Sequence, residues 1–103
     1  MIARIWNGKT DIVHFETYSS FLEYVAIPDY EKTPGFRGLV FLRNQDDQHA
    51  WFKLITYWDS IQSIKGFAGP DYKKAKYYPG DKNFLLHFEE EAEQYEVFAK
   101  SGK

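Results

Sequence analysis

Apolar residues recur along the chain with two different periods, and these periods predict its elements. Residues 2–7 are typical of a strand that ends at Gly8, and Thr10 and Asp11 then offer side-chain oxygens that can start a helix. The next apolar positions have helical spacing. They are Phe15, Tyr18, Phe21, Leu22 and Val25. The first part of the chain therefore predicts a strand followed by a helix.

The middle of the chain predicts a β-hairpin. Pro28 either limits the helix or begins a short extra turn directly after it. Thr33-Pro34-Gly35 is a turn signal that separates the helix from the next element. Two apolar runs, residues 36–43 and 50–58, flank a polar segment that is too long for a two-residue turn. These runs are therefore expected to pair through a longer loop.

The last part of the chain predicts a second helix and a closing strand. Asp59 or Ser60 can cap a helix that runs through Phe67. After it we expect, in order, a further turn over residues 72–77, a loop over 78–83, a helical turn or strand over 84–88, and a last strand over 92–98. The order β-α-β-β-α-β is the split βαβ pattern of a ferredoxin-like α+β fold with an antiparallel four-stranded sheet. With 103 residues, the chain (1–103) has room for a single domain.

The hairpin also predicts a homodimer. Both of its strands are apolar on both faces, whereas a half-solvated antiparallel strand should alternate apolar and polar residues. Two helices can cover only one face of such a sheet, and a second copy of the same sheet is the economical cover for the other. The alternative is an aromatic-rich outer face that is tolerated in water, although large exposed patches are uncommon.

Composition narrows the possible partners. The net charge is −2 with both signs mixed, so no electrostatic footprint for nucleic acid or an anionic membrane is present. The absence of cysteine excludes disulfides, thiolate metal sites and thiol nucleophiles. No apolar run is long enough to cross a membrane, and a soluble, cytoplasmic protein is the default expectation. Aromatic residues make up 19% of the chain, more than one small core can hide, so some should line a pocket or an interface.

Several segments together resemble one known family. They are Met1–Trp6, Pro28–Tyr30 with Thr33–Gly38, Thr56–Ser60, Ile64–Tyr72 and Glu93–Val97. These segments are similar to those of the antibiotic biosynthesis monooxygenase (ABM) superfamily of dimeric α+β barrels. The resemblance covers nearly the whole chain and keeps the element order given above. The family includes quinone-forming oxygenases, heme-degrading oxygenases and proteins of unknown activity, so the resemblance is specific for fold and weak for function.

The resemblance implies a pocket between sheet and helices in which an aromatic dihydroxy substrate loses a proton and the resulting anion activates oxygen without a cofactor. Asn7 and Trp58 match family positions for an anchoring amide and an indole, and Tyr72 could hydrogen-bond a quinol-like substrate in the same cavity. These three are the predicted catalytic residues. Each also has an ordinary structural explanation, since Asn7 could serve a strand-ending turn and the two aromatics could simply pack in the core.

A second group of residues is predicted to contact the substrate. Its members are Tyr24, Tyr30, Arg37, Phe67, Tyr77 and His87. A tyrosine is more often a core residue with a satisfied hydroxyl, Arg37 could instead form a surface ion pair, and His87 could be a surface or packing histidine. The three histidines are isolated in sequence, which predicts no dedicated metal site.

Heme is disfavoured by one departure from the family pattern. Heme-degrading members place an axial histidine on the second helical segment, where residues 72–78 of this chain contain none. A tyrosine phenolate could ligate iron, but nothing in the sequence selects that role. No cofactor is therefore expected.

Two classes of function stay open. The first is a cofactor-independent monooxygenase acting on a small aromatic, quinol-like molecule. The second is a non-catalytic dimeric barrel that binds a small apolar ligand or serves as a stress-type module. Convergence of Asn7, Trp58 and Tyr72 on one enclosed cavity would favour the enzyme.

Overall fold

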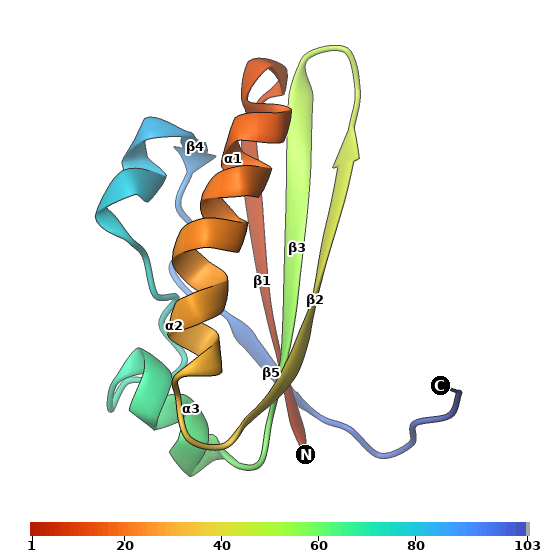
Figure 1. Ribbon diagram of the computed structural model, residues 1–103, viewed down its shortest axis with the longest axis vertical. Helices are drawn as coiled ribbons and strands as arrows, with labels where there is room; N and C mark the ends of the chain where they lie inside the picture. Colours follow the sequence, from red (N-terminus) through yellow and green to blue (C-terminus); the bar gives the residue numbers. More distant parts are fainter. Residues whose placement is uncertain (103) are drawn as a thin grey trace.

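The computed structural model describes residues 1–102 and shows helices packed on one face of an antiparallel sheet (Figure 1). The strand order is β2-β3-β1-β4, and β5 also pairs with β1. The three long strands are β1 (Ile2–Asp11), β2 (Phe36–Gln45) and β3 (His49–Trp58). The predicted α+β class with an antiparallel sheet is confirmed, and the hairpin forms where it was predicted. The sheet has five strands rather than the predicted four.

β1 is the central strand and is longer than predicted. It pairs with β3 along its whole length, from Ile2 opposite Trp58 to Asp11 opposite His49. The strand passes through Gly8 instead of ending there. A Cβ atom at Gly8 would lie 2.2 Å from Cη2 of Trp6, so the missing side chain makes room for the indole ring on the same face.

One helical run crosses this face of the sheet. The Asp11 side chain accepts a hydrogen bond from the Val13 amide and starts a short 3₁₀ turn, η1 (Ile12–His14). The run continues through α1 (Phe15–Phe21), a π-helical stretch, η2 (Leu22–Ala26), and α2 (Ile27–Glu31). Pro28 lies in the first turn of α2, where its missing N–H is harmless, so the proline begins an extra turn rather than ending the helix.

The second helix, α3 (Ile61–Ala68), begins as the sequence predicts. The Ser60 hydroxyl accepts a hydrogen bond from the Ser63 amide, and Gly69, at φ +95°, ends the helix. The further turn predicted over residues 72–77 is wrong beyond Lys74. A single turn closes between Asp71 and Lys74, and the chain then runs without regular structure to a 3₁₀ helix, η3 (Pro79–Asn83).

Two short strands lie beside β1 on the edge opposite β3, where the sequence predicts a single fourth strand. β4 (Leu85–His87) pairs with the end of β1 at Lys9 and Thr10, and β5 (Glu93–Glu96) pairs with its start. The residues between them leave the sheet because their backbone bonds to an earlier segment. The Ala75 amide donates to the Glu90 carbonyl, and the Ala92 amide donates to the Lys73 carbonyl.

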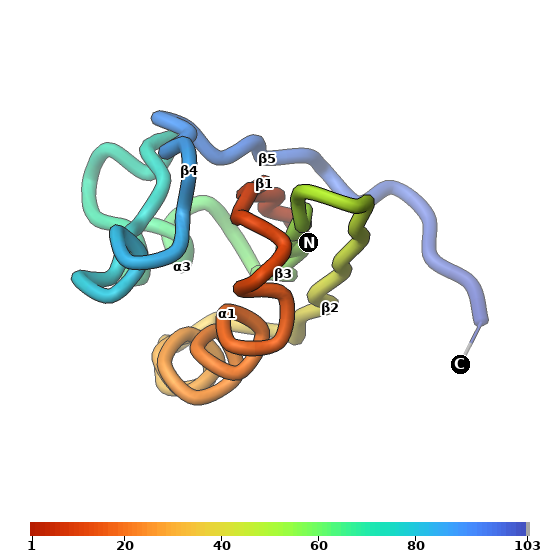
Figure 2. Tube along the Cα trace, turned by 90° about the horizontal axis from the view of Figure 1, so that it is seen from above, coloured from red at the N-terminus to blue at the C-terminus, as the bar shows by residue number. Residues whose placement is uncertain are grey.

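The strands separate a buried face from a largely open one. Side chains at every second position of β1 and β3 face the helices, and Trp6, Phe52, Leu54 and Trp58 form the core there. Seen along the strands, the helical run, α3 and the segment that follows α3 as far as β4 lie on that side of the sheet (Figure 2). The predicted division into one covered and one uncovered face is therefore present in the protomer.

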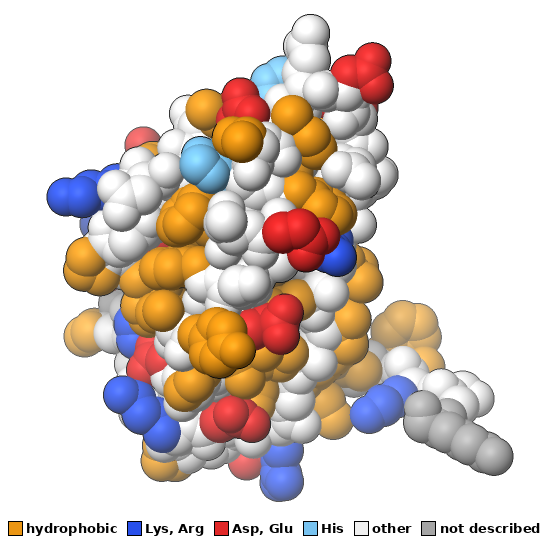
Figure 3. Space-filling view, turned by 45° about the horizontal axis from the view of Figure 1, so that its top comes forward, with side chains coloured by type: hydrophobic (Ala, Val, Ile, Leu, Met, Phe, Trp, Pro, Cys, Tyr) orange, Lys and Arg blue, Asp and Glu red, His pale blue; other side chains and the backbone are white. Residues whose placement is uncertain are grey.

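The outer face of the sheet carries exposed apolar side chains. Val40, Leu42, Trp51 and Tyr95 are all exposed, and Phe98, on the C-terminal tail, is 94% exposed. The tail stands away from the body on the side opposite the helices (Figure 2). On the face shown in Figure 3, acidic and basic side chains are scattered among hydrophobic ones, and neither sign forms a continuous patch. Within residues 1–102, no helix combines the length and apolar character needed to cross a membrane.

Candidate functional site

A small, partly open cavity lies between the sheet and the helices, and we call it the interlayer cavity. Its apolar wall is formed by Trp6, Leu22, Ala26, Leu54 and Phe67. Polar groups complete the lining, among them Arg4, Tyr30, Tyr77 and Asp81. Its volume is about 20 Å³, which is room for roughly one water molecule. The cavity is therefore small in this conformation, and titratable side chains make up more than half of its lining.

Asp81 is the buried carboxyl group of this cavity. It lies in η3, is 3% exposed, and accepts hydrogen bonds from the Tyr18 hydroxyl at 2.9 Å and from the Tyr78 amide at 2.6 Å. Within residues 1–102, no lysine, arginine or histidine forms an ion pair with it. Burial raises the pKa of Asp81 above its usual value, although both hydrogen bonds oppose the shift. A carboxyl group in this setting is suited to taking up a proton.

The tyrosines beside Asp81 remain neutral phenols. Burial, together with the nearby Asp81 carboxylate, raises the pKa of Tyr18 far above its usual value. Burial likewise raises the pKa of Tyr30 to about 12, although the positive charge of Arg4 opposes the shift. Both groups therefore act as hydrogen-bond donors rather than as anions at neutral pH.

Residues 69–84, which we call the cover segment, close one side of the cavity. Side-chain hydrogen bonds hold it in place. The Tyr78 hydroxyl and the Lys76 ammonium each donate to Oδ2 of Asp29 at 2.7 Å. Burial alone would raise the pKa of Asp29, but these two hydrogen bonds outweigh it and lower that pKa. The Tyr77 hydroxyl accepts from Nε1 of Trp6 at 3.0 Å and donates to the Glu89 carbonyl at 2.6 Å.

Three of the predicted substrate-binding residues meet at the interlayer cavity. Tyr30, Phe67 and Tyr77 all line it, and they come from α2, α3 and the cover segment. The rings of Tyr30 and Phe67 stack with their centroids 4.5 Å apart. Aromatic residues far apart in the sequence thus supply one wall of the cavity.

The predicted catalytic residues lie apart from one another. Trp58 is 0% exposed and packs among Tyr30, Phe36 and Phe67, and its Nε1 donates to Oγ1 of Thr56 at 2.8 Å. Asn7 is exposed on the opposite face of the sheet, since it follows the helix-facing Trp6 in β1. The two side chains therefore do not share a cavity in the protomer.

Asn7 and His87 meet in an open groove on the outer face. The groove has a volume of about 330 Å³ and is also lined by Lys9, Trp51 and Glu89. The His87 Nε2 atom lies 3.9 Å from Oε1 of Glu89, and both side chains are largely exposed. This groove faces solvent and lacks a buried titratable group, so we do not treat it as the centre of the chemistry.

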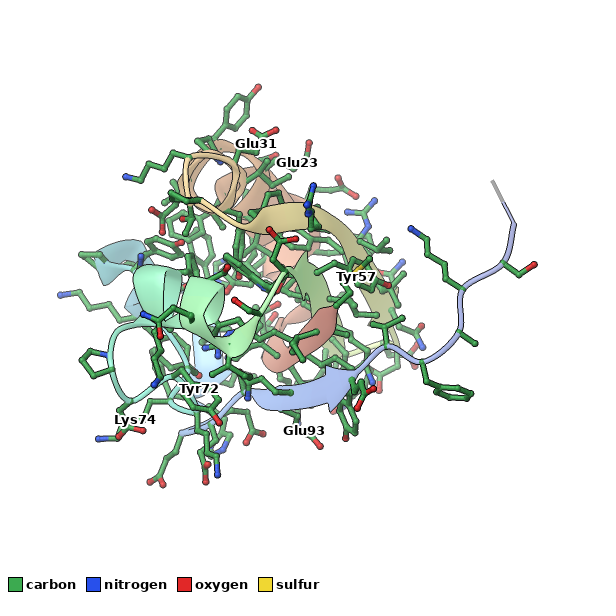
Figure 4. The ribbon with its side chains drawn as sticks, turned by 90° about the horizontal axis from the view of Figure 1, so that it is seen from below. Glu23, Glu31, Tyr57, Tyr72, Lys74 and Glu93 are labelled. Atoms are coloured by element: carbon green, nitrogen blue, oxygen red, sulfur yellow. The ribbon has the colours of Figure 1, made fainter. Side chains whose placement is uncertain are left out.

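The remaining predicted residues lie on the surface or at another edge. Tyr72 lies between α3 and β5 in a groove that includes Glu93 (Figure 4). Tyr24 is exposed on η2, on the helix layer that also carries Glu23 and Glu31 (Figure 4). Arg37 is exposed and forms an ion pair with Asp59. None of the three lines the interlayer cavity.

Arg4, Tyr18 and Asp81 line the cavity but were not predicted from the sequence as site residues. Side chains two positions apart in a strand lie on the same face of the sheet, so Arg4 lies on the same face as Trp6. This spacing is the one feature of the sequence that could have placed Arg4 beside the helices. No local pattern marks Asp81, which follows Tyr-Pro-Gly in a segment typical of a solvated turn.

Comparison with solved structures identifies the fold. An arginine-to-serine mutant of MhuD, solved with two manganese protoporphyrin IX molecules bound per active site, matches with a TM-score of 0.64 at 17% identity. The match covers 100% of both chains. A Bacillus cereus protein provisionally named an antibiotic biosynthesis monooxygenase matches with a TM-score of 0.62 at 11% identity. That match covers 99% of this chain and 97% of the other.

The chain has the fold of these two proteins. The fold implied by the resemblance to the ABM superfamily is therefore confirmed. At these identities the likeness concerns the fold alone. No protein-family model matches the sequence, and a search of curated proteins finds no significant match.

Proposed function

We propose that this protein is a monooxygenase that binds a small aromatic, quinol-like molecule in the interlayer cavity and oxidises it without a resident cofactor. The observation that carries the proposal is Asp81, a buried carboxyl group that has no cation partner within residues 1–102 and faces a cavity walled by aromatic rings. The name of the Bacillus cereus protein, which has the same fold, adds support for the reaction class.

In the proposed reaction, Asp81 removes a proton from the substrate, and the electron-rich anion reacts with molecular oxygen. One oxygen atom enters the substrate and the other leaves as water, so an anthrone loses its two methylene hydrogens and gains a carbonyl. Tyr18, Tyr77 and Tyr78 donate their hydroxyl protons to protein acceptors. In the proposal, Tyr30 is therefore the cavity tyrosine that donates a hydrogen bond to the charge that develops. The apolar wall excludes water from the reactive anion.

Substrate entry requires the cover segment to move outward, because the cavity holds only about one water molecule. This movement breaks side-chain hydrogen bonds, such as those between Tyr78 and Asp29 and between Tyr77 and Trp6. It also affects the backbone bonds of residues 73–75 to residues 90–92, but it dismantles no long helix or strand. Segments held in this way open at lower free energy than core elements.

Heme does not fit the residues that line the cavity. No histidine lines it, since His14 packs against Phe84, His49 lies beside Trp51, and His87 lies on the outer face. The Tyr77 and Tyr78 hydroxyls are already engaged with protein partners. Although the MhuD mutant binds a metalloporphyrin, we assign no step in this protein to heme.

Oxygen uptake tests the proposed reaction. Metal-stripped protein is expected to consume oxygen with at least one quinol from a panel of anthrones and dihydroxynaphthalenes, and a chelator should leave the rate unchanged. An oxygen electrode measures the rate, and product mass should show the substrate plus one oxygen atom minus two hydrogens. Absence of uptake with every quinol would contradict the proposal.

A non-catalytic ligand-binding protein is the second candidate. The small volume of the cavity favours it, since a cavity of this size can open around a ligand without any chemistry following. Binding of a quinol without oxygen uptake would select this alternative.

We also propose that the outer face of the sheet joins two copies of the chain. Val40, Leu42 and Trp51 lie on one uncovered face, and a second copy of the same sheet would bury them. Sedimentation at micromolar concentration is expected to give a dimer, and Leu42→Lys should shift it toward the monomer. Val13→Lys, at an exposed position on η1, is the matched control. A stable monomer for the unaltered protein would contradict the dimer.

A further inference from the structure

Arg4 is a buried cation without an anionic partner among residues 1–102. It lies on β1, is 4% exposed and faces the interlayer cavity. No aspartate or glutamate within residues 1–102 forms an ion pair with it. Burial lowers the pKa of Arg4, but an arginine remains charged at neutral pH. Buried charges are normally paired, so this one is an exception that calls for a function.

The hydrogen bonds of Arg4 leave part of its guanidinium group free. Nη1 donates to the Tyr72 carbonyl and to Oε1 of Gln94, and Nη2 donates to the Lys74 carbonyl at 2.9 Å. All three acceptors are neutral. A guanidinium has five N–H donors, so two make no hydrogen bond within residues 1–102. The group that faces the cavity thus keeps both its full charge and spare donors.

The other polar groups of the cavity do not neutralise Arg4, and Asp81, the cavity's carboxyl group, forms no ion pair with Arg4. Tyr30 is close enough for its electrostatics to couple to Arg4, but burial keeps that phenol protonated. The Lys76 ammonium, which also lines the cavity, is already paired with Asp29. A ligand with a negative group would therefore gain a charge-assisted hydrogen bond at Arg4 that a neutral ligand cannot make.

We propose that the ligand of the interlayer cavity is an aromatic carboxylate, a phenol or quinol whose ring carries a carboxyl group, with Arg4 as its anchor. This inference rests on the proposed function and names its substrate class. The planar guanidinium suits a carboxylate, which it can bind through two parallel hydrogen bonds. The carboxylate lies at Arg4 and away from Asp81, since like charges repel, and a ring hydroxyl then serves as the proton donor to Asp81.

Binding of matched ligands without oxygen tests the substrate class. The probes are 1,4-dihydroxy-2-naphthoate, its methyl ester and 1,4-dihydroxynaphthalene, which differ in charge but share the ring. The quenching of tryptophan fluorescence gives each Kd. We expect the carboxylate to bind at least about tenfold more tightly than either neutral probe. Equal affinities of the three probes for the unaltered protein would overturn the inference.

Substitution of Arg4 separates anchoring from a structural role. Arg4→Met should reduce the preference for the carboxylate over its ester to about one, whereas Arg4→Lys should keep a part of it. If Arg4 only holds Tyr72 and Lys74 in place, both probes would weaken equally and the ratio would be unchanged, which would contradict the anchor. Should Arg4→Met fail to fold, the comparison of acid and ester in the unaltered protein decides the matter.

The outcomes also distinguish this inference from the proposed function. Oxygen uptake with neutral quinols, with no preference for the acid, would leave the monooxygenase intact and remove the carboxylate anchor. Failure of all three probes to bind would remove both.

Discussion

Asp81→Asn is expected to lower the rate of quinol-dependent oxygen uptake by about 10²–10⁴-fold while the protein stays folded. Asparagine cannot take up the substrate proton. Its single amide oxygen can accept only one of the two hydrogen bonds that Asp81 accepts from Tyr18 and Tyr78, so the unfolding free energy should fall by about 1–3 kcal/mol. The oxygen electrode gives the rate, and thermal unfolding confirms the fold.

Two further variants test whether the reaction takes place in the interlayer cavity or in the groove on the outer face. Asp47→Asn makes the same chemical change at an exposed position in the hairpin loop and should leave the rate unaltered. Asn7→Ala probes the groove on the other face of the sheet. If Asn7→Ala abolishes uptake and Asp81→Asn does not, the reaction takes place on the outer face and the interlayer cavity is the wrong site.

The pH dependence of uptake should follow Asp81. Its proton must be lost before it can act as a base, so the rate should rise with pH, with a midpoint above the usual value of an aspartate. Stability changes in the opposite direction. Because the pKa of Asp81 is higher in the folded than in the unfolded protein, its contribution to stability falls as pH rises between these two values. Asp81→Asn should remove both effects.

Trp58→Ala is expected to destabilise the protein by about 3–5 kcal/mol. The side chain is fully buried among three aromatic rings, and its N–H donates to the Thr56 hydroxyl, so the substitution leaves a large cavity and removes one of the two hydrogen bonds of that hydroxyl. Urea unfolding measures the loss. Trp58→Phe, which keeps most of the volume, should lose less.

The same variant tests the catalytic role that the sequence predicts for Trp58. Phe98→Ala, the control, removes an aromatic ring that is 94% exposed and should change the unfolding free energy by no more than about 0.5 kcal/mol. A Trp58→Ala protein that kept its stability and lost ligand binding would support a direct role at the site. Loss of stability with ligand binding preserved would assign Trp58 to the core.

Local patterns predicted the elements best where a side chain interacts with its own segment. Asp11 and Ser60 begin helical turns through hydrogen bonds to amides two and three residues away, and the apolar spacing between Phe15 and Val25 belongs to one continuous helix. These interactions are encoded within a few residues, so the sequence displays them directly.

The sequence was less informative where distant segments decide the structure. β4 and β5 are separate strands because residues 90 and 92 between them form hydrogen bonds with the backbone of residues 73–75. Those residues are distant in the sequence. These hydrogen bonds also explain why the turn predicted over residues 72–77 does not continue beyond Lys74. Asp81 is buried by Tyr18, 63 positions earlier, and no neighbouring residue marks that contact. Sequence period alone places Asn7 and Trp6 on opposite faces, but it does not say which face the helices cover.

The central position of β1 has a consequence for synthesis. β1 is made first, yet one of its edges is completed only by β4 and β5, from residues 85–87 and 93–96. The acceptors of Arg4, at Tyr72, Lys74 and Gln94, also lie late in the chain. While the ribosome is still adding these residues, the hairpin can pair with β1 but the guanidinium stays hydrated. The cavity and its charge are therefore assembled last, after nearly the whole chain has emerged.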